Sequence, residues 1–330
     1  MDTILVTGAT GFLGGSVLEK LLKDGHKIIA LVRSLPKEDQ GGNLVFVKGE
    51  ITKSNIGVGK KDRQLLKGVS HIIHCAALAH FQERSPKLFK TNVQGTKNVL
   101  GLARELKNLK AFVHISSKSV AGNFEGVFPE QTLPEIKSFH NAYEKSKYEA
   151  EKLVRKSGLP FIIIRPPAIV GDSKTGSADR FEGSAYRIIS ALVRRRLPFY
   201  PGSCGGFLYI MPVDKIAEFI TKVYSDKKYL KTTFNITDPF PFTFKKFIVT
   251  SSRLLGVPKP IFTFPGPLWS LTLSLASHTP FAGVGSLALF NQKLRYENKA
   301  FIAASRKYGV KYPSLVKYLP VLIKFYKENS

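Results

Sequence analysis

The chain has 330 residues, of which 43% are hydrophobic and 22% are charged, the balance of an ordinary globular protein. Its 50 Lys and Arg residues against 24 Asp and Glu residues give a formal net charge of +26, which indicates an anionic membrane surface, an acidic substrate or carrier protein as partner, or simply a solvated lysine-rich surface. No nucleic-acid motif accompanies the charge, which argues against nucleic acid, and the two cysteines, Cys75 and Cys204, exclude a disulfide framework.

A glycine-rich turn lies near the N-terminus. Residues 4–6 predict a short buried strand, and the apolar period over residues 17–22 predicts an amphipathic helix. Between them, Gly8, Gly11 and Gly14 follow the spacing G-x-x-G-x-x-G. The first two glycines would allow a tight turn and the approach of a pyrophosphate, and the third would allow the helix to pack closely on the strand. The stretch therefore predicts a dinucleotide-binding turn.

The second predicted strand covers residues 27–32 and ends at Arg33. In dinucleotide-binding folds this end of the strand faces the adenosine ribose. An acidic residue there pairs with the 2′-hydroxyl, whereas an arginine suits a 2′-phosphate. Arg33 therefore favours NADP over NAD. The alternative is an arginine that merely lies at the surface.

Strands and helices alternate along the next part of the chain. Apolar runs predict strands at residues 44–48, 71–75, 111–115 and 161–164, and a helix over residues 86–106. This alternation predicts an α/β fold with a Rossmann-type, doubly wound parallel sheet. After the strand at 71–75, the small side chains of Ala76 and Ala77 would allow a cofactor to come close.

The pattern loosens after Gly171. Residues 172–181 predict a loop over the carboxyl ends of the strands, where ligands bind in such folds. Strands are expected at 207–211 and 232–236, with Asp214 as the cap of a helix that runs to Val223. We therefore expect two parts of the chain. An NADP-binding domain would comprise residues 1–170 joined by 207–236, and a smaller, mostly helical substrate-binding subdomain would comprise 171–206 and 237–330.

Residues 260–292 contain no Asp, Glu, Lys or Arg. Prolines and glycines interrupt the apolar side chains, so no unbroken run of about 20 residues could span a bilayer. The segment predicts a buried or pocket-forming subdomain, with an interfacial membrane patch or an acyl-chain channel as alternatives. No signal peptide precedes the first strand, so a cytoplasmic location is expected, with peripheral membrane association left open.

Tyr143 and Lys147 lie four residues apart in a strongly helical stretch. This spacing places the phenol and the ammonium on one helix face, and a nearby ammonium lowers the pKa of a tyrosine. Tyr143 could then exchange a proton with a carbonyl or hydroxyl oxygen while a hydride moves at the adjacent carbon. Ser117, at the end of a predicted strand, would be the second hydrogen-bond partner of that oxygen, and no metal is expected. The alternative is a surface pair on an amphipathic helix.

Five further motifs accompany these residues, namely Gly49-Glu-Ile-Thr-Lys-Ser-Asn-Ile-Gly57, His74-Cys-Ala-Ala77, Asn92-Val-Gln-Gly-Thr96, Asn141-Ala-Tyr-Glu-Lys-Ser-Lys147 and Ile169-Val-Gly-Asp-Ser-Lys-Thr-Gly176. With them, the chain resembles the extended short-chain dehydrogenase/reductases, and within these the thioester-reductase and fatty-acyl-reductase branch.

The resemblance implies a site. Ser117, Tyr143 and Lys147 would form a catalytic triad, with Lys147 also binding the nicotinamide ribose. NADP would be held by the glycine motif, Arg33 and neighbouring residues, namely Gly8, Thr10, Gly11, Phe12, Leu13, Gly14, Glu50, Ile51, Ala76, Ala77, Asn92, Tyr143, Lys147, Pro166, Ala168 and Ile169. A homodimer through paired helices, including the helix of Tyr143, is also implied.

Four positions depart from this branch. Glu50 stands where Asp is common, and Ser117 stands where Thr is usual, which keeps the hydroxyl. Lys118 and Ser119 replace the small or aromatic pair that usually follows the catalytic hydroxyl.

The leading hypothesis is an NADPH-dependent oxidoreductase. Its substrate would be a small molecule, apolar or lipid-like and CoA- or carrier-protein-linked, with a thioester, aldehyde or ketone carbonyl. The alternatives are a nucleotide-sugar epimerase or dehydratase, a hydroxysteroid-dehydrogenase-like enzyme at a membrane surface, and a redox-sensing regulator. Dehydratases carry an Asp-Glu pair where Lys118 and Ser119 stand, and epimerases and the steroid enzymes favour NAD, against Arg33. A sensor would not need the three catalytic side chains.

Overall fold

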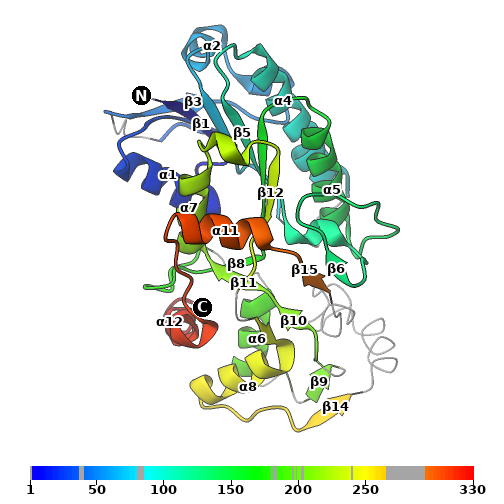
Figure 1. Cartoon of the computed structure of the whole chain (residues 1–330). Coiled ribbons are helices and arrows are strands. Elements are labelled where there is room, and N and C mark those ends of the chain that lie inside the picture. Colours follow the sequence, from blue (N-terminus) through cyan, green and yellow to red (C-terminus); the bar gives the residue numbers. More distant parts are fainter. Residues whose placement is uncertain are drawn as a thin grey trace.

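The computed structural model describes residues 2–36, 41–79, 85–179, 181, 184–194, 197, 199–201, 204–238, 241–264 and 294–330. Its central sheet has seven parallel strands in the order β12-β7-β5-β4-β1-β2-β3 (Figure 1). They are β1 (Thr3–Thr7), β2 (Lys27–Val32), β3 (Leu44–Lys48), β4 (His71–His74), β5 (Ala111–Ile115), β7 (Phe161–Arg165) and β12 (Thr232–Asn235). Such strands are rich in Ile, Val and Leu because both faces of the sheet are covered. The predicted doubly wound parallel sheet is confirmed.

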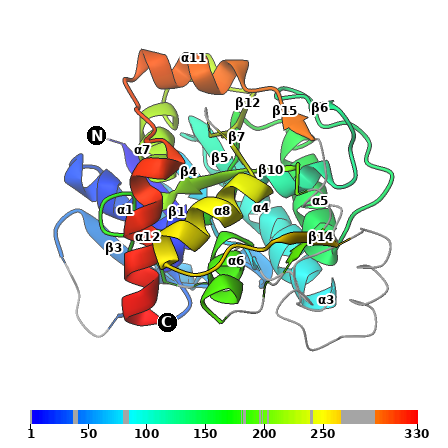
Figure 2. The same cartoon turned by 90° about the horizontal axis from the view of Figure 1, so that it is seen from below.

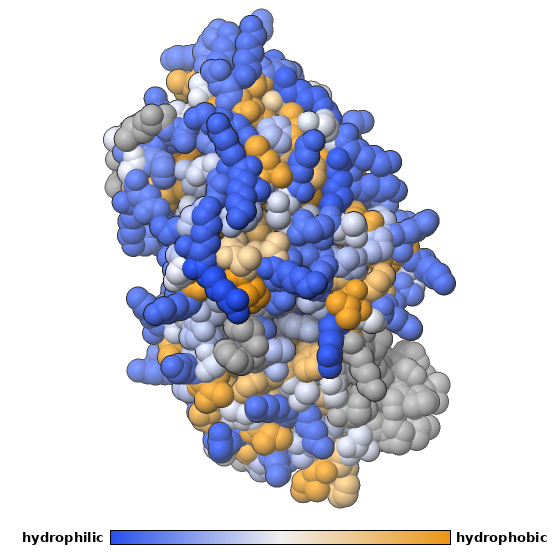
Figure 3. Space-filling model, in the orientation of Figure 1, coloured by the Kyte–Doolittle hydropathy of each residue, from blue (hydrophilic) through white to orange (hydrophobic). Residues whose placement is uncertain are grey.

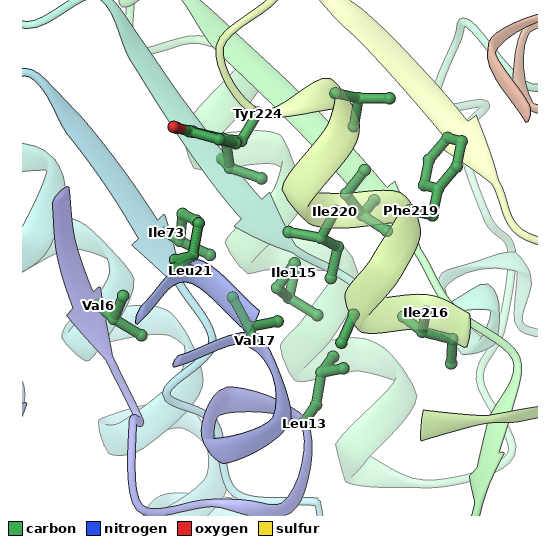
Figure 4. Close-up of a cluster of buried hydrophobic side chains, with 14 of the residues drawn as sticks. Val6, Leu13, Val17, Leu21, Ile73, Ile115, Ile216, Phe219, Ile220 and Tyr224 are labelled. Atoms are coloured by element: carbon green, nitrogen blue, oxygen red, sulfur yellow. The ribbon is translucent and has the colours of Figure 1, made fainter. Parts of the chain in front are cut away.

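Helices cover both faces of this sheet. One face is packed against α1 (Phe12–Lys23), α7 (Val213–Val223) and α11 (Lys299–Lys307). Figure 4 shows side chains of α1 and α7 meeting above the strands, among them Leu13, Val17, Ile216 and Ile220. The other face is packed against α2 (Lys60–Leu66), α4 (Gly95–Glu105) and α5 (Ala142–Arg155). The predicted helix over 86–106 is α3 (Ser85–Leu88), a π-helical turn (Phe89–Gln94) and α4 in succession.

A second buried cluster joins α6 (Ser184–Val193), α8 (Phe244–Leu255) and α12 (Leu315–Asn329). Short strand pairs accompany it: β8 (Ala168–Val170) with β11 (Ile210–Pro212), β9 (Phe199–Pro201) with β14 (Phe262–Phe264), β10 (Phe207–Leu208) with β13 (Phe242–Thr243), and β6 (Val127–Phe128) with β15 (Arg295–Tyr296). Figure 1 shows α6, α8, β9 and β14 at the end of the molecule opposite α2. Most of the uncharged segment, 265–292, lies outside the described residues.

Two expectations about this part of the chain are wrong. The strand expected at 207–211 is divided at Tyr209, because β10 pairs antiparallel with β13 and β11 pairs parallel with β8. Asp214 does not cap α7, because Pro212 occupies the N-cap position and Asp214 lies in the first turn. Its carboxylate instead accepts hydrogen bonds from the backbone N and the hydroxyl of Ser173, at 2.8 and 2.7 Å. The strand expected at 232–236 is β12, which pairs with β7 at the sheet edge.

Candidate active site

The glycine motif forms the turn between β1 and α1. Gly8 has a φ of +73°, and a Cβ atom on it would lie 2.6 Å from the backbone N of Ala76; a Cβ on Gly14 would lie 2.0 Å from the carbonyl O of Gly8. Only glycine therefore fits at these two positions. Gly11 is the N-cap of α1, whose first turn contains no acidic side chain. The helix therefore begins with amide donors and a positive dipole end, which fit the pyrophosphate of a dinucleotide.

Arg33 lies at the same edge of the sheet as the glycine turn. It is exposed directly after β2, and β2 pairs in parallel with β1, with Leu31 opposite Thr7. Glu50 follows β3 at this edge, and its carboxylate accepts a hydrogen bond from the hydroxyl of Thr52 at 2.7 Å. The order of β1, β2 and β3 thus brings the predicted phosphate, ribose and adenine contacts to one edge.

The other residues expected to hold NADP differ in exposure. Thr10 and Ala77 are exposed, and Phe12, Ala76, Ala168 and Ile169 are half-buried. Leu13, Ile51 and Pro166 are buried, so their side chains belong mainly to the core. Their contacts with a cofactor stay predictions.

The side-chain amide of Asn92 forms hydrogen bonds through both its oxygen and its nitrogen. Its side chain is 1% exposed and bonds the backbone N and O of Leu78, at 2.7 and 3.1 Å, and the hydroxyl of Ser146, at 2.9 Å. These bonds give Asn92 a positioning role, because they fasten the chain that follows β4 to α5.

The three predicted catalytic residues meet at the carboxyl end of β5. Asn141 caps α5 by accepting a hydrogen bond from the backbone N of Glu144 at 3.0 Å, and the helix then places Tyr143 and Lys147 on its buried face. The ammonium of Lys147 donates to the carbonyl O of Ile115 at 2.7 Å. Ser117 follows β5 two residues later and hydrogen-bonds the phenol of Tyr143.

The pKa of Tyr143 differs from the value expected from the sequence. Burial raises the pKa of Tyr143 above its ordinary value, although the hydrogen bond from Ser117 opposes the shift. The expected lowering of the Tyr143 pKa by Lys147 is therefore wrong for this structure, because desolvation of the phenolate raises the pKa and outweighs the hydrogen bond from Ser117. Burial also lowers the pKa of Lys147 to about 8. A protonated phenol is suited to give a proton to a carbonyl oxygen.

Buried histidines lie behind the site, and sequence reasoning assigned them no role, although His74 begins the motif His74-Cys-Ala-Ala77. His74 connects three elements, because its Nδ1 lies 2.7 Å from the hydroxyl of Thr7 in β1 and its Nε2 lies 3.1 Å from that of Thr96 in α4. Burial lowers its pKa to about 3, so the imidazole is neutral at physiological pH. No group of three or more metal-ligating His, Cys, Asp or Glu side chains occurs in the described part of the chain.

A buried charge cluster holds α5 against the sheet. Glu151 of α5 lies 2.6 Å from Arg165 at the end of β7, and both side chains are 0% exposed. Glu151 also accepts a hydrogen bond from Ser116, next to Ser117, at 2.6 Å. Tyr143, Lys147 and Glu151 follow one another at intervals of four residues, so they lie on one face of α5. This spacing was the signal in the sequence that could have revealed Glu151.

Lys118 directly follows Ser117 and is buried. Its Nζ lies 3.2 Å from the ring centroid of Tyr209 and 3.5 Å from that of Tyr296, and it has no hydrogen-bond partner among the residues that the structure describes. The hydroxyl of Tyr296 donates to the carbonyl O of Lys118 at 3.2 Å. The lysine thus connects the segment after Ser117 to β15 and to the break between β10 and β11. Burial holds its pKa well below the ordinary value, although Asp238 raises it.

Replacing Lys118 by Met should raise the free energy of unfolding at pH 7 by about 1 kcal/mol or more. Burial of the amine disfavours the folded state whether it keeps its charge or loses its proton, and Met is apolar and of similar length. The advantage should shrink as the pH rises. Because the pKa is lowered in the folded protein, the unfolded chain binds the Lys118 proton more tightly. The stability of the wild type therefore rises with pH until the pH reaches the unfolded pKa of about 10.4. Urea unfolding of both proteins at pH 7 and pH 10 measures this. A difference that does not change with pH would contradict the lowered pKa.

The sequence of this chain is similar to that of a known family. It matches the male sterility protein family over residues 6–44 and 37–220. A fatty acyl-CoA reductase of Drosophila melanogaster is 27% identical over 267 residues, which cover 64% of this chain and 52% of that protein. The L-2-aminoadipate reductase of Schizosaccharomyces pombe is 26% identical over 257 residues, which cover 66% of this chain and 18% of that protein. The chain thus spans about half or less of the length of these curated relatives.

Solved structures agree with the family match. The terminal R domain from the myxalamid PKS-NRPS biosynthetic pathway superposes with a TM-score of 0.82 at 25% identity, covering 98% of this chain and 90% of that one. UDP-glucuronic acid 4-epimerase from Bacillus cereus, in complex with NAD, superposes with a TM-score of 0.72 at 17% identity over 99% of each chain, which shows the shared fold alone. The chain therefore belongs to the male sterility protein family and is an NAD(P)-binding extended short-chain dehydrogenase/reductase, similar to thioester-reductase domains and fatty acyl-CoA reductases.

Proposed function

We propose that the chain is an NADPH-dependent oxidoreductase that reduces the carbonyl of a thioester, aldehyde or ketone in an apolar, acyl or lipid-like substrate. The observation that carries the proposal is the meeting of Ser117, Tyr143 and Lys147 beside the glycine turn. Lys147 lies close enough to Cys75 for its ammonium to lower the pKa of the thiol, against the raising effect of burial. The next residue, Ala76, packs against the turn, because its backbone N would lie 2.6 Å from a Cβ on Gly8. The proton donor and the dinucleotide turn therefore share one edge of the sheet.

The reaction follows from these positions. NADPH bound at the glycine turn would supply the hydride that adds to the carbonyl carbon. Tyr143 gives its proton to the carbonyl oxygen, and the hydroxyl of Ser117 hydrogen-bonds the same oxygen. Lys147, held on the carbonyl of Ile115, would bind the nicotinamide ribose. An aldehyde or ketone becomes an alcohol by this addition, whereas a thioester would next lose its thiol and leave an aldehyde.

The proposed substrate class has two supports. The relatives include proteins named as a fatty acyl-CoA reductase and as a terminal R domain of a PKS-NRPS pathway. The net charge of +26 also suits the phosphates of a CoA or an acidic carrier protein. Residues 1–170 and 207–236 would then hold NADPH, and residues 171–206 and 237–330 would shape the substrate pocket.

The test is NADPH consumption by the purified protein with acyl-CoA thioesters, the matching aldehydes, a 3-ketosteroid and UDP-sugars. Turnover of a thioester or aldehyde supports the proposal. Conversion of a UDP-sugar with no net change of cofactor, and no reduction of any other substrate, would overturn it in favour of a nucleotide-sugar epimerase.

Replacing Arg33 by Ala should raise the KM for NADPH by about 10- to 100-fold, because a charge-assisted contact to the 2′-phosphate is lost. The KM for NADH should change little. Lys27→Ala is the matched control, because Lys27 is an exposed cation at the opposite end of β2. Equal effects of Arg33→Ala on both cofactors would contradict recognition of the 2′-phosphate.

A further inference from the structure

The end of the molecule opposite α2 exposes large apolar side chains. Ile261 is 78% exposed, Phe262 in β14 is 72% exposed, and Leu254 at the end of α8 is 37% exposed. Figure 2 looks onto this end, with α8 and β14 in front, and Figure 3 shows hydrophobic side chains at its tip. Two neighbouring large side chains with most of their surface in water are unusual unless they meet a partner.

Exposed cations lie on the stretch of chain that leads to these side chains. Lys245 and Lys246 lie in the first turn of α8, Arg253 lies in its last turn, and Lys259 precedes Ile261; all four are exposed. The elements at this end, α6, α8, β9 and β14, contain no Asp or Glu. Indeed, no acidic residue occurs in the sequence between Asp238 and Glu297. We call the exposed set the basic-apolar face, which consists of Lys245, Lys246, Arg253, Leu254, Lys259, Ile261 and Phe262.

The charge of the face restricts what can cover it. A second copy of this chain, docked by the same face, would bring these cations against one another. A nucleic acid would meet the charges but would leave Ile261 and Phe262 without an apolar environment. An anionic bilayer meets both requirements, because its headgroups attract lysine and arginine and its acyl boundary accepts projecting apolar side chains.

We propose that the basic-apolar face docks this protein on the surface of an anionic lipid bilayer, with Ile261 and Phe262 inserted at the acyl boundary. No helix in the described part of the chain is long and apolar enough to cross a membrane. The proposed contact is instead made by exposed side chains at the surface of the fold. It would place the protein where apolar acyl substrates are concentrated, but it does not depend on which carbonyl is reduced.

Co-sedimentation of the full chain with vesicles tests the proposal. Vesicles of phosphatidylcholine mixed with phosphatidylglycerol should bind the protein at low salt, and pure phosphatidylcholine should bind it much more weakly. The double variant Lys245→Ala/Lys246→Ala should weaken binding by about tenfold or more, since each cation near the surface contributes about fivefold. Ile261→Ser/Phe262→Ser should also weaken it by about tenfold or more. The replaced side chains are exposed, so thermal unfolding should be unchanged.

Leu65→Ser is the matched control, because Leu65 is 48% exposed on α2 at the opposite end of the molecule. It should leave vesicle binding unchanged, and Phe262→Trp should keep it. Absence of binding to anionic vesicles would overturn the proposal, as would equal losses in Leu65→Ser and Ile261→Ser/Phe262→Ser. Binding that requires Lys245 and Lys246 but not Ile261 and Phe262 would also overturn it, because the two apolar side chains would then not be inserted at the acyl boundary.

Discussion

Replacing Tyr143 by Phe is expected to lower kcat by about 10²- to 10⁴-fold, the usual contribution of a positioned proton donor. The carbonyl oxygen would keep only the hydroxyl of Ser117, and the negative charge that develops on it would lack a proton. Tyr143 is 9% exposed, and the substitution removes one oxygen atom, so the packing of α5 is retained. The measurement is kcat with the best substrate of the panel, together with NADPH binding followed by its fluorescence, which should change little.

Tyr148→Phe is the control for this prediction. Tyr148 also lies on α5 and is 8% exposed, but its hydroxyl donates to the carbonyl O of Pro134 at 3.2 Å. Its loss should cost at most about 1 kcal/mol of stability and should leave kcat unchanged. Equal kcat values for Tyr143→Phe and the wild type would remove Tyr143 from the reaction. A wild type that binds NADPH but reduces no substrate would favour the sensor hypothesis.

Replacing Glu151 by Leu is expected to lower the free energy of unfolding by about 3–5 kcal/mol, the usual effect of leaving a buried charge without its partner. The carboxylate of Glu151 contacts Arg165 at 2.6 Å and Arg155 at 2.9 Å, and accepts from Ser116 at 2.6 Å. Arg165 is fully buried, so no water can replace the lost carboxylate. Urea unfolding of the variant and the wild type at neutral pH measures the loss.

The effect should depend on pH in a defined direction. Burial alone would raise the pKa of Glu151, but the charge and hydrogen bonds of Arg165 lower it below the ordinary value. Its contribution to stability is therefore fully present above the unfolded pKa of about 4.3 and is lost as the pH falls through the lowered value. The difference between the wild type and Glu151→Leu should shrink in strong acid.

Glu19→Leu is the control, because Glu19 forms an ion pair with the same N–O distance at the surface. Glu19 contacts Lys23 at 2.6 Å, but the two side chains are 67% and 71% exposed. Solvent screens such a pair, so its loss should change stability by no more than about 0.5 kcal/mol. The double variant Glu151→Leu/Arg165→Met should recover part of the loss, because no charge is left buried. A loss below about 1 kcal/mol for Glu151→Leu would contradict the assigned role of the cluster.

Much of the Rossmann fold could be predicted from the sequence. The strands expected at 27–32, 44–48 and 111–115 have those bounds in the structure, because each is an apolar run bounded by polar or glycine residues. The glycine turn and the Tyr143–Lys147 pair were likewise predictable, since a short spacing on one turn or one helix face determines their geometry. These features depend on residues that are neighbours in the chain.

What the tertiary structure decided depends on residues far apart in the chain. Tyr209 and Tyr296 enclose Lys118 from 91 and 178 positions away, and the same contacts accompany the break between β10 and β11. Asp214 binds Ser173 instead of capping its helix. The pKa of Tyr143 rises because the fold buries the phenol, whereas the sequence shows only the nearby lysine. Local periodicity determines which face of an element is apolar, but burial, and with it the charge state of a side chain, is determined only when the elements pack together.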